Sequence, residues 1–319
     1  MKKDDKKKKK VIPFVFNFEN EVVQIDEGNY VIDTKDNKVW LKNKDKLIED
    51  AFTKSFGDVL KIVCEKDEET GDVAFIFVPK NPKEEAITLV LDREGHIVEY
   101  HNPNVKKLGK GFLEDNDTLK VFECKSVEEI GDNFLRGNKT ALEELDMPRI
   151  KKLGNNALEN NESLECDLGE LELPVEEMGN ACFKSNTKFM SVRLGSLKKC
   201  GNDCFVNCNA REVVIGNLHD RNIEIGDNFF QNNKDAENIT IYASKIGAYC
   251  FEKNKQAFNV KLPSLKYAQI GLLYNAEKIE RIDVPKLERI DCNCFGGEDF
   301  AANYLAREQI AENTSKNKK

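Results

Sequence analysis

The sequence predicts a solenoid of short stacked coils, preceded by a strand-rich segment. A short phrase recurs along the chain with a period of about 22 residues, and a short strand pattern precedes each copy. IGDNF occurs at 130–134 and again at 225–229, with LGNNA at 153–157 and CGNDC at 200–204 between them. Self-similarity at this period is typical of repeat proteins, whose function usually lies in a long surface.

The glycine of this phrase anchors a register that other residue types share. An apolar residue precedes nearly every anchor, and a large apolar residue, usually aromatic, follows three or four positions later. An asparagine usually stands seven positions after the anchor, and its amide can satisfy backbone groups of the turn because it both donates and accepts. The register predicts about nine coils over residues 96–299. The anchor positions are Gly109, Gly131, Gly154, Gly179, Gly201, Gly226, Gly247, Gln269 and Asp291.

A short strand is predicted upstream of each anchor. Its apolar residues lie two apart, as in Leu171 with Leu173 and Val192 with Leu194, so one side faces the core and the other faces solvent. A proline often follows directly, as at Pro174, and ends the strand because it lacks a backbone donor. Each repeat is therefore predicted as strand, turn, short helical or irregular return, and turn.

Three stretches carry the repeat most clearly: LDMPRIKKLGNNALENNESL (145–164), VRLGSLKKCGNDCFVNCNA (192–210) and IDVPKLERIDCNCF (282–295). They resemble leucine-rich repeats of the BspA-like class. The resemblance implies an α/β fold, a right-handed leucine-rich-repeat solenoid with a parallel β-sheet on its concave side. It also implies binding of other proteins, adhesion in many secreted members, and no catalytic residues.

The segments that flank the repeats predict a cap at each end. Residues 11–95 lack the register and are predicted as strands between polar turns, forming a β-rich N-terminal cap or small domain. Within them, residues 47–64 resemble a degenerate repeat. Residues 300–311 (FAANYLAREQIA) predict a closing helix, and the lysine-rich residues 1–10 and residues 312–319 predict disordered tails.

Composition limits the partner classes. The chain is 40% hydrophobic and 33% charged, which is typical of globular proteins, and its net charge of -8 argues against nucleic acid. The apolar run VIPFVFNF (11–18) is too short to span a membrane, and no signal-peptide cleavage site follows it. We therefore expect a monomer that binds protein, without nucleic acid or a membrane span.

The ten cysteines predict buried core thiols rather than disulfides or a zinc site. Cys200 and Cys208 also occupy positions of the repeat register. Cys200, Cys204 and Cys208 are spaced four residues apart, but no histidine beyond His219 lies near them in the sequence, so no metal or cofactor is expected. Free thiols and the missing export signal favour the cytoplasm, with a secreted or cell-surface location as the alternative if a leader has been removed. Four cysteines lie beside the aromatic position: Cys182, Cys204, Cys250 and Cys294.

Catalytic signatures are missing from the sequence. It contains no phosphate-binding loop, no nucleophile elbow and no metalloprotease motif, and it has only three histidines. We therefore expect no enzyme activity and no catalytic residues. An intracellular protein-interaction scaffold is the leading interpretation. The alternatives are a surface adhesin of the BspA-like type and an enzyme whose site lies in residues 11–95.

The outward side of the predicted strands is the candidate binding surface. The first four repeats carry six carboxylates among eight outward positions, whereas later repeats are mixed. Clustered negative charge favours a basic protein segment as the partner, although charged residues can also simply keep an exposed sheet soluble. The candidate partner-binding residues are Glu99, Glu123, Glu144, Asp146, Glu170, Glu172, Arg193, Thr240, Tyr242 and Lys261.

Overall fold

The structure is a computed structural model with two compact units, residues 1–105 with 118–126 and residues 106–117 with 127–319. Both predicted tails, residues 47–58 of the degenerate repeat and all of the predicted closing helix except Glu308 lie outside the described residues. The described residues are 11–17, 22–25, 30–33, 38–41, 59–67, 69–93, 96–138, 142–164, 169–219, 222–254, 256–257, 259–276, 279–291, 293–294 and 308.

Antiparallel strands make up most of the first unit. Its main sheet has the order β1-β5-β6-β7-β8-β10, and the chain changes to parallel pairing between β8 and β10. The strands β1 to β7 lie between residues 11 and 92, in the segment that was predicted to form strands between polar turns. Whether residues 11–95 act as a cap stays a prediction. The main-sheet strands are β1 (Val11–Asn17), β5 (Val59–Asp67), β6 (Val73–Pro79), β7 (Ile87–Leu91), β8 (Ile97–His101) and β10 (Val121–Glu123), and a separate antiparallel sheet contains β2 (Val22–Ile25), β3 (Tyr30–Asp33) and β4 (Lys38–Leu41).

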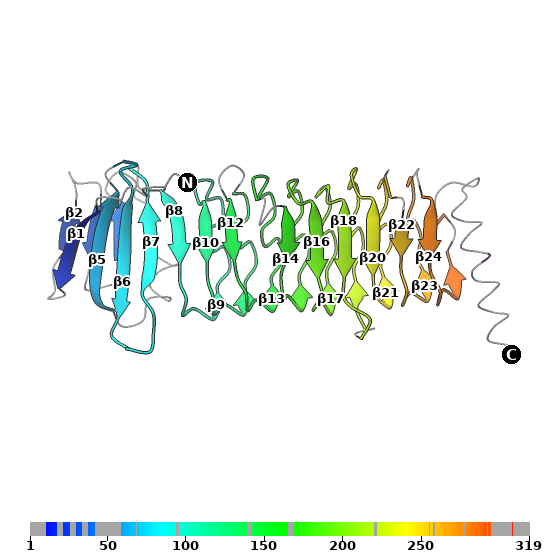
Figure 1. Cartoon of the computed structure of the whole chain (residues 1–319), viewed down its shortest axis with the longest axis horizontal. Coiled ribbons are helices and arrows are strands. Elements are labelled where there is room, and N and C mark those ends of the chain that lie inside the picture. The colour runs from blue at the N-terminus through cyan, green and yellow to red at the C-terminus, as the bar shows by residue number, and fades with distance from the viewer. Residues whose placement is uncertain are drawn as a thin grey trace, which may run out of the picture. The chain divides into compact units, whose positions relative to one another are not determined.

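Longer strands of the second unit stack in chain order into a parallel six-stranded sheet, seen as neighbouring arrows from β14 to β24 (Figure 1). Pairing of each strand with its counterpart one repeat later is the stacking that the period predicts. The sheet contains β14 (Glu170–Glu172), β16 (Ser191–Leu194), β18 (Glu212–Ile215), β20 (Asn238–Ile241), β22 (Asn259–Lys261) and β24 (Arg281–Asp283), and β12 (Glu144–Asp146) is a further longer strand.

Short strands of two residues form a second parallel ladder, which the sequence analysis did not predict. Each ends at the apolar residue before an anchor, and that residue is buried in nearly every coil. One ladder contains β9 (Lys107–Leu108), β11 (Glu129–Ile130), β13 (Lys152–Leu153), β15 (Glu177–Met178), β17 (Lys199–Cys200), β19 (Glu224–Ile225) and β21 (Lys245–Ile246), and β23 (Tyr267–Ala268) pairs with β25 (Arg289–Ile290).

The described residues of the second unit do not support the predicted α/β class, because its coils return through turns rather than through helices. Residues two and six positions after the anchor have positive φ, as in Asn133 (59°) and Gly137 (84°), and a right-handed helix excludes that conformation. The second unit is therefore a parallel β-solenoid, whereas its handedness and concave side stay predictions. The two positive-φ columns hold Gly111, Asn133, Asn156, Ala181, Asp203, Asn228, Tyr249, Gly271 and Asn293, and Asp115, Gly137, Asn160, Ser185, Asn207, Asn232, Lys253 and Asn275.

The aromatic position of the repeat fills the interior of the coils. The rings of Phe183 and Phe205 stack with centroids 5.2 Å apart, and Phe229 meets Phe205 edge-on at 5.3 Å. All three rings are fully buried, and each contributes on the order of 1.5–3 kcal/mol through burial. The predicted core is confirmed.

Anchor glycines lie where the backbones of neighbouring coils meet. A Cβ added at Gly154 would lie 2.5 Å from the backbone nitrogen of Asp132 and 2.5 Å from the carbonyl carbon of Gly131. At Gly109, the first anchor, an added Cβ would meet nothing within 4 Å. Glycine recurs at this position because a side chain would separate the coils.

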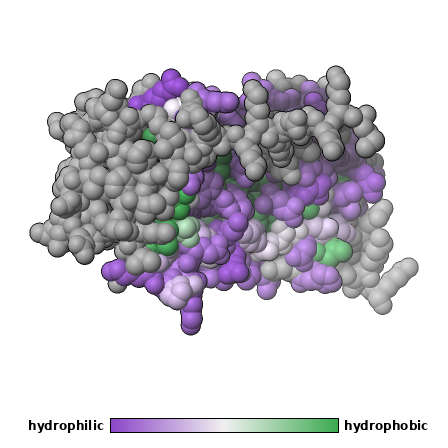
Figure 2. Space-filling model, turned by 60° about the vertical axis from the view of Figure 1, so that its left-hand side comes forward, coloured by the Kyte–Doolittle hydropathy of each residue, from purple (hydrophilic) through white to green (hydrophobic). Residues whose placement is uncertain are grey.

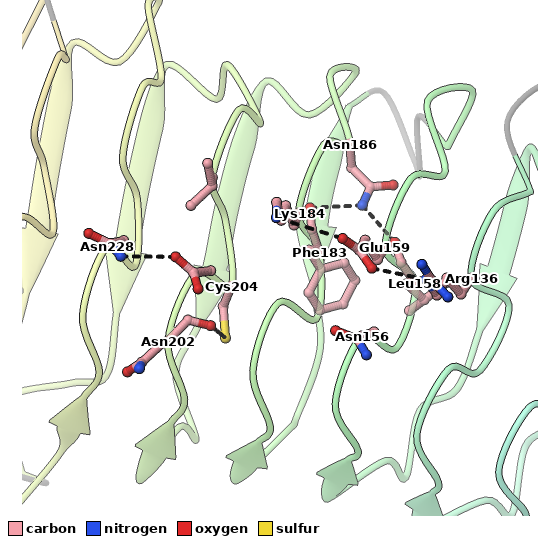
Figure 3. Close-up of polar contacts among 12 residues, drawn as sticks. Arg136, Asn156, Leu158, Glu159, Phe183, Lys184, Asn186, Asn202, Cys204 and Asn228 are labelled. Atoms are coloured by element: carbon pink, nitrogen blue, oxygen red, sulfur yellow. Dashed lines mark hydrogen bonds and ion pairs between the residues drawn. The ribbon is translucent and has the colours of Figure 1, made fainter.

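The asparagine seven residues after the anchor bonds the coils together. Asn186 is fully buried, and its Nδ2 donates to the carbonyls of Leu158, at 2.7 Å, and of Phe183, at 2.8 Å (Figure 3). Cys208 replaces this asparagine in the next coil, and its Sγ donates to the same Phe183 carbonyl at 2.9 Å. The predicted structural role of the column is confirmed.

Seven cysteines are buried free thiols: Cys124, Cys182, Cys200, Cys204, Cys208, Cys250 and Cys294. Sγ of Cys204 donates to the carbonyl of Gly179 at 3.0 Å, and Sγ of Cys250 donates to that of Gly226 at 3.0 Å. Burial raises the pKa of Cys208 and Cys250 to about 12. Because the thiolate is the reactive form, these thiols are chemically protected while the coils are folded.

A thiol reagent should therefore distinguish the folded from the unfolded chain. Cys64, Cys166 and Cys292 would first be replaced by serine, so that only the buried cysteines remain. We expect the folded variant to react with an aromatic disulfide reagent at least about 100-fold more slowly than the same variant in denaturant. Equal rates, followed by absorbance of the released thiolate, would contradict the burial of this column.

Candidate interaction surface

Two of the predicted site residues, Glu99 and Glu123, flank His101 in the first unit. Parallel pairing of β8 with β10 places His101 opposite Glu123, with Nδ1 2.8 Å from the carboxylate, while Nε2 lies 3.1 Å from Glu99. Nζ of Lys125 lies 2.6 Å from the other oxygen of Glu123. Both carboxylates thus have hydrogen-bond partners in their own unit, and Glu123 is also paired with the Lys125 ammonium, which lowers their value for attracting a basic partner.

A cavity of about 350 Å³ opens beside this cluster. Its rim is braced by Asn104, whose Nδ2 donates to the carbonyl of Glu85 at 2.7 Å and whose Oδ1 accepts from the Glu85 amide at 3.0 Å. The hydrogen bond with Glu99, and next that with Glu123, raises the pKa of His101 against the opposing effect of burial. When it is protonated, His101 bridges the two carboxylates as a cation. The cavity is lined by Glu85, Ala86, Thr88, His101, Asn102, Pro103, Glu123 and Lys125.

The His101 cluster should make stability depend on pH. Because folding raises the pKa of His101 above 6.5, its contribution is fully present below that pH and is lost as pH rises through the folded pKa. Lys125, and then His101, lower the pKa of Glu123 below 4.5, so its contribution is lost as pH falls below that value. We expect the difference in urea midpoint between wild type and His101→Gln to be largest from about pH 4.5 to 6.5 and to shrink on both sides. Midpoint curves that stay parallel would contradict this role.

The remaining predicted residues lie in the second unit, most of them on what we call the long-strand face, the outward residues of β14 to β24. Glu170 and Glu172 lie on β14, Tyr242 directly follows β20, and Glu144 and Asp146 lie on β12 outside this sheet. A single acidic patch from Glu99 to Glu172 stays a prediction. Strand register gives the face two rows: Glu170, Ser191, Glu212, Asn238, Asn259 and Arg281, and Glu172, Arg193, Val214, Thr240, Lys261 and Asp283.

Most charges on the long-strand face are unpaired. Within the described residues, Arg193 and Glu212 form its one ion pair, at 2.8 Å. Glu170, Glu172 and Lys261 are exposed and have no ion-pair partner among the residues that the structure describes. These charges are available to a partner.

Most charges beside the short strands, by contrast, form ion pairs with one another. Successive coils alternate between lysine pairs and glutamate pairs from Lys106 and Lys107 to Lys198 and Lys199, a pattern that sequence reasoning missed although it directly precedes the anchors. Parallel register then sets each lysine opposite a glutamate. The ion pairs are Lys107–Glu129 (2.7 Å), Lys151–Glu128 (2.7 Å), Lys152–Glu177 (3.1 Å), Lys198–Glu176 (2.6 Å), Lys245–Glu224 (3.7 Å) and Lys266–Glu288 (3.5 Å).

A third charged column, five residues after the anchor, is also paired (Figure 3). Arg136 lies 3.2 Å from Glu114 and 3.1 Å from Glu159, and Lys184 lies 3.9 Å from the other oxygen of Glu159. The described residues visible in Figure 2 are mostly hydrophilic, with hydrophobic residues in small areas. Polarity alone therefore does not single out a binding surface.

The repeat architecture agrees with a comparison of the sequence with known families. Residues 96–165 and 176–301 match the BspA type leucine rich repeat region, in six copies. The protein belongs to this family. Membership accounts for the stacked strands, whereas the charge patterns described above are properties of this chain.

Two solved structures are similar to this chain at low identity. A leucine-rich repeat protein from Bacteroides ovatus is 16% identical, with a TM-score of 0.42, over 66% of this chain and 65% of that one. A leucine rich cell surface protein from Faecalibacterium prausnitzii is 12% identical, with a TM-score of 0.43, over 66% of this chain and 76% of that one. No curated protein matches the sequence. Among the described residues, no helix is long and apolar enough to cross a membrane.

Proposed function

We propose that this protein is a non-catalytic scaffold that binds another protein on the long-strand face. The observation that carries the proposal is the contrast in charge pairing. Most charges beside the short strands and in the turn column form ion pairs within the chain, whereas Glu170, Glu172 and Lys261 do not, within the described residues. Unpaired charges on a regular sheet favour fast and specific association with a partner of complementary charge.

The face also has a candidate for apolar contact at its centre. Tyr242 is half-buried after β20, and Gly216 lies beside it, since a Cβ added there would be 3.5 Å from the Tyr242 Cβ. Leu218, two residues further along that loop, is 64% exposed. Aromatic residues at the centre of an interface commonly carry much of the binding energy, so Tyr242 is the side chain that we expect to anchor a partner.

Affinity capture with mass spectrometry tests the proposal. Wild-type protein and the Glu170→Lys/Glu172→Lys variant would be used as baits in lysate of the native cell and in material from its surroundings. The matched control, Glu162→Lys/Asp235→Lys, changes net charge equally at exposed turn positions. We expect a partner that the control retains and the face variant loses.

Equal capture by all three proteins would overturn the choice of face. The source of the partner is equally informative. Recovery from lysate would support the predicted cytoplasmic scaffold, whereas recovery from the surroundings would support the predicted surface adhesin.

A further inference from the structure

We infer that the long-strand face binds an extended polypeptide segment with basic residues at one end and acidic residues at the other. The inference rests on the proposed function, because it uses the same face. It adds the chemistry and the shape of the partner, which charge pairing alone does not specify.

The unpaired charges change sign along the sheet. Glu170 and Glu172 give β14 two negative charges, whereas Lys261 and Arg281 outweigh Asp283 on β22 and β24. Arg193 and Glu212 neutralise each other in between. A partner of uniform charge would be repelled at one end, so a segment with opposite charges at its two ends fits best. The uncharged centre holds Val214, Asn238, Thr240 and Asn259.

The dimensions of the face match one extended chain. Neighbouring strands are about 4.8 Å apart, so β14 and β24 are separated by about 24 Å along the sheet. An extended chain covers about 3.4 Å per residue, and roughly seven residues span that distance. The two rows of outward residues are two positions apart on each strand, or about 7 Å, whereas a helix is about 10–12 Å wide.

The inference is tested with two synthetic peptides of identical composition, KKSVVSEE and KESVVSKE. The first separates its charges and the second mixes them. With fluorescence anisotropy at low ionic strength, we expect the first peptide to bind about tenfold more tightly, since the mixed peptide can place fewer charges on opposite partners. The preference should vanish in Glu170→Lys/Glu172→Lys and persist in Glu162→Lys/Asp235→Lys.

Equal affinity for the two peptides, or binding of neither, would overturn the inference. Its failure is distinguishable from failure of the proposed function. If capture of the native partner still depends on Glu170 and Glu172, the face is correct and the partner is not an extended charge-separated segment. If that capture is independent of the face, the proposed function fails as well.

Discussion

Gly154→Ala is expected to destabilise the solenoid by about 3 kcal/mol or more. The added Cβ would lie 2.5 Å from backbone atoms of the preceding coil, and backbone cannot rotate away as a flexible side chain can. The coils would have to separate, which would weaken the neighbouring backbone bond from the Gly154 amide to the Ile130 carbonyl, 2.9 Å long. Urea unfolding followed by circular dichroism measures the loss.

Gly109→Ala is the matched control, because it changes the same register position where an added Cβ meets nothing within 4 Å. Alanine restricts the unfolded chain, so we expect this variant to be unchanged or more stable by up to about 1 kcal/mol. A similar loss in both variants would mean that glycine is required at this position for a reason other than the contact between coils.

The glycine column explains why so much of this fold could be predicted from sequence. The anchors from Gly131 to Gly247 repeat the same close approach to the preceding coil, so the constraint recurs in the sequence with the period of the structure. Core residues such as Phe205 and Val192 recur for the same reason, because each packs against its counterparts in adjacent coils. Because the same contacts recur in successive coils, they produce a periodic pattern in the amino-acid sequence.

The returns between strands were harder to predict, because residues that favour positive φ and residues that do not occupy the same position of the repeat. Asn133 and Asn156, two residues after their anchors, tolerate positive φ, which indicates a turn, but Ala181 and Tyr249 occupy the same position without that preference. The geometry is imposed by the stack rather than by each residue. A helical return was therefore compatible with local sequence, although positive φ excludes it in the structure.

The candidate site depends on which residues face one another across coils. The sequence prediction did not include these pairings, and it was least accurate for this reason. Counting outward carboxylates placed Glu99 and Glu123 in an acidic patch that could bind a partner, whereas β8 and β10 place both beside His101. Parallel register could have predicted that pairing, because His101 and Glu123 are both outward residues one repeat apart. The charge of a surface residue indicates a binding site only once its side-chain neighbours on the adjacent strands are known.

Asn233→Ala is expected to cost about 4 kcal/mol or more. Asn233 is fully buried, and its Nδ2 donates to the carbonyls of Phe205, at 2.9 Å, and of Phe230, at 2.8 Å. Its Oδ1 accepts from the amides of Cys208 and Asn209, each at 2.6 Å. Alanine would leave these backbone groups buried without that partner, and each unsatisfied group costs about 1–3 kcal/mol.

The chain provides its own control for this prediction in Cys208, which occupies the equivalent position one coil earlier and keeps only the donor, to the Phe183 carbonyl at 2.9 Å. Asn233→Cys should therefore retain a bond to Phe205 while losing both acceptor bonds, and we expect about half the loss of the alanine variant. Urea midpoints of the two variants, measured with wild type, separate the donor from the acceptor contribution. A loss of unfolding free energy below about 1 kcal/mol in Asn233→Ala would mean that these hydrogen bonds have little net value. The asparagine position would then be needed for the conformation of the turn rather than for bonding between coils.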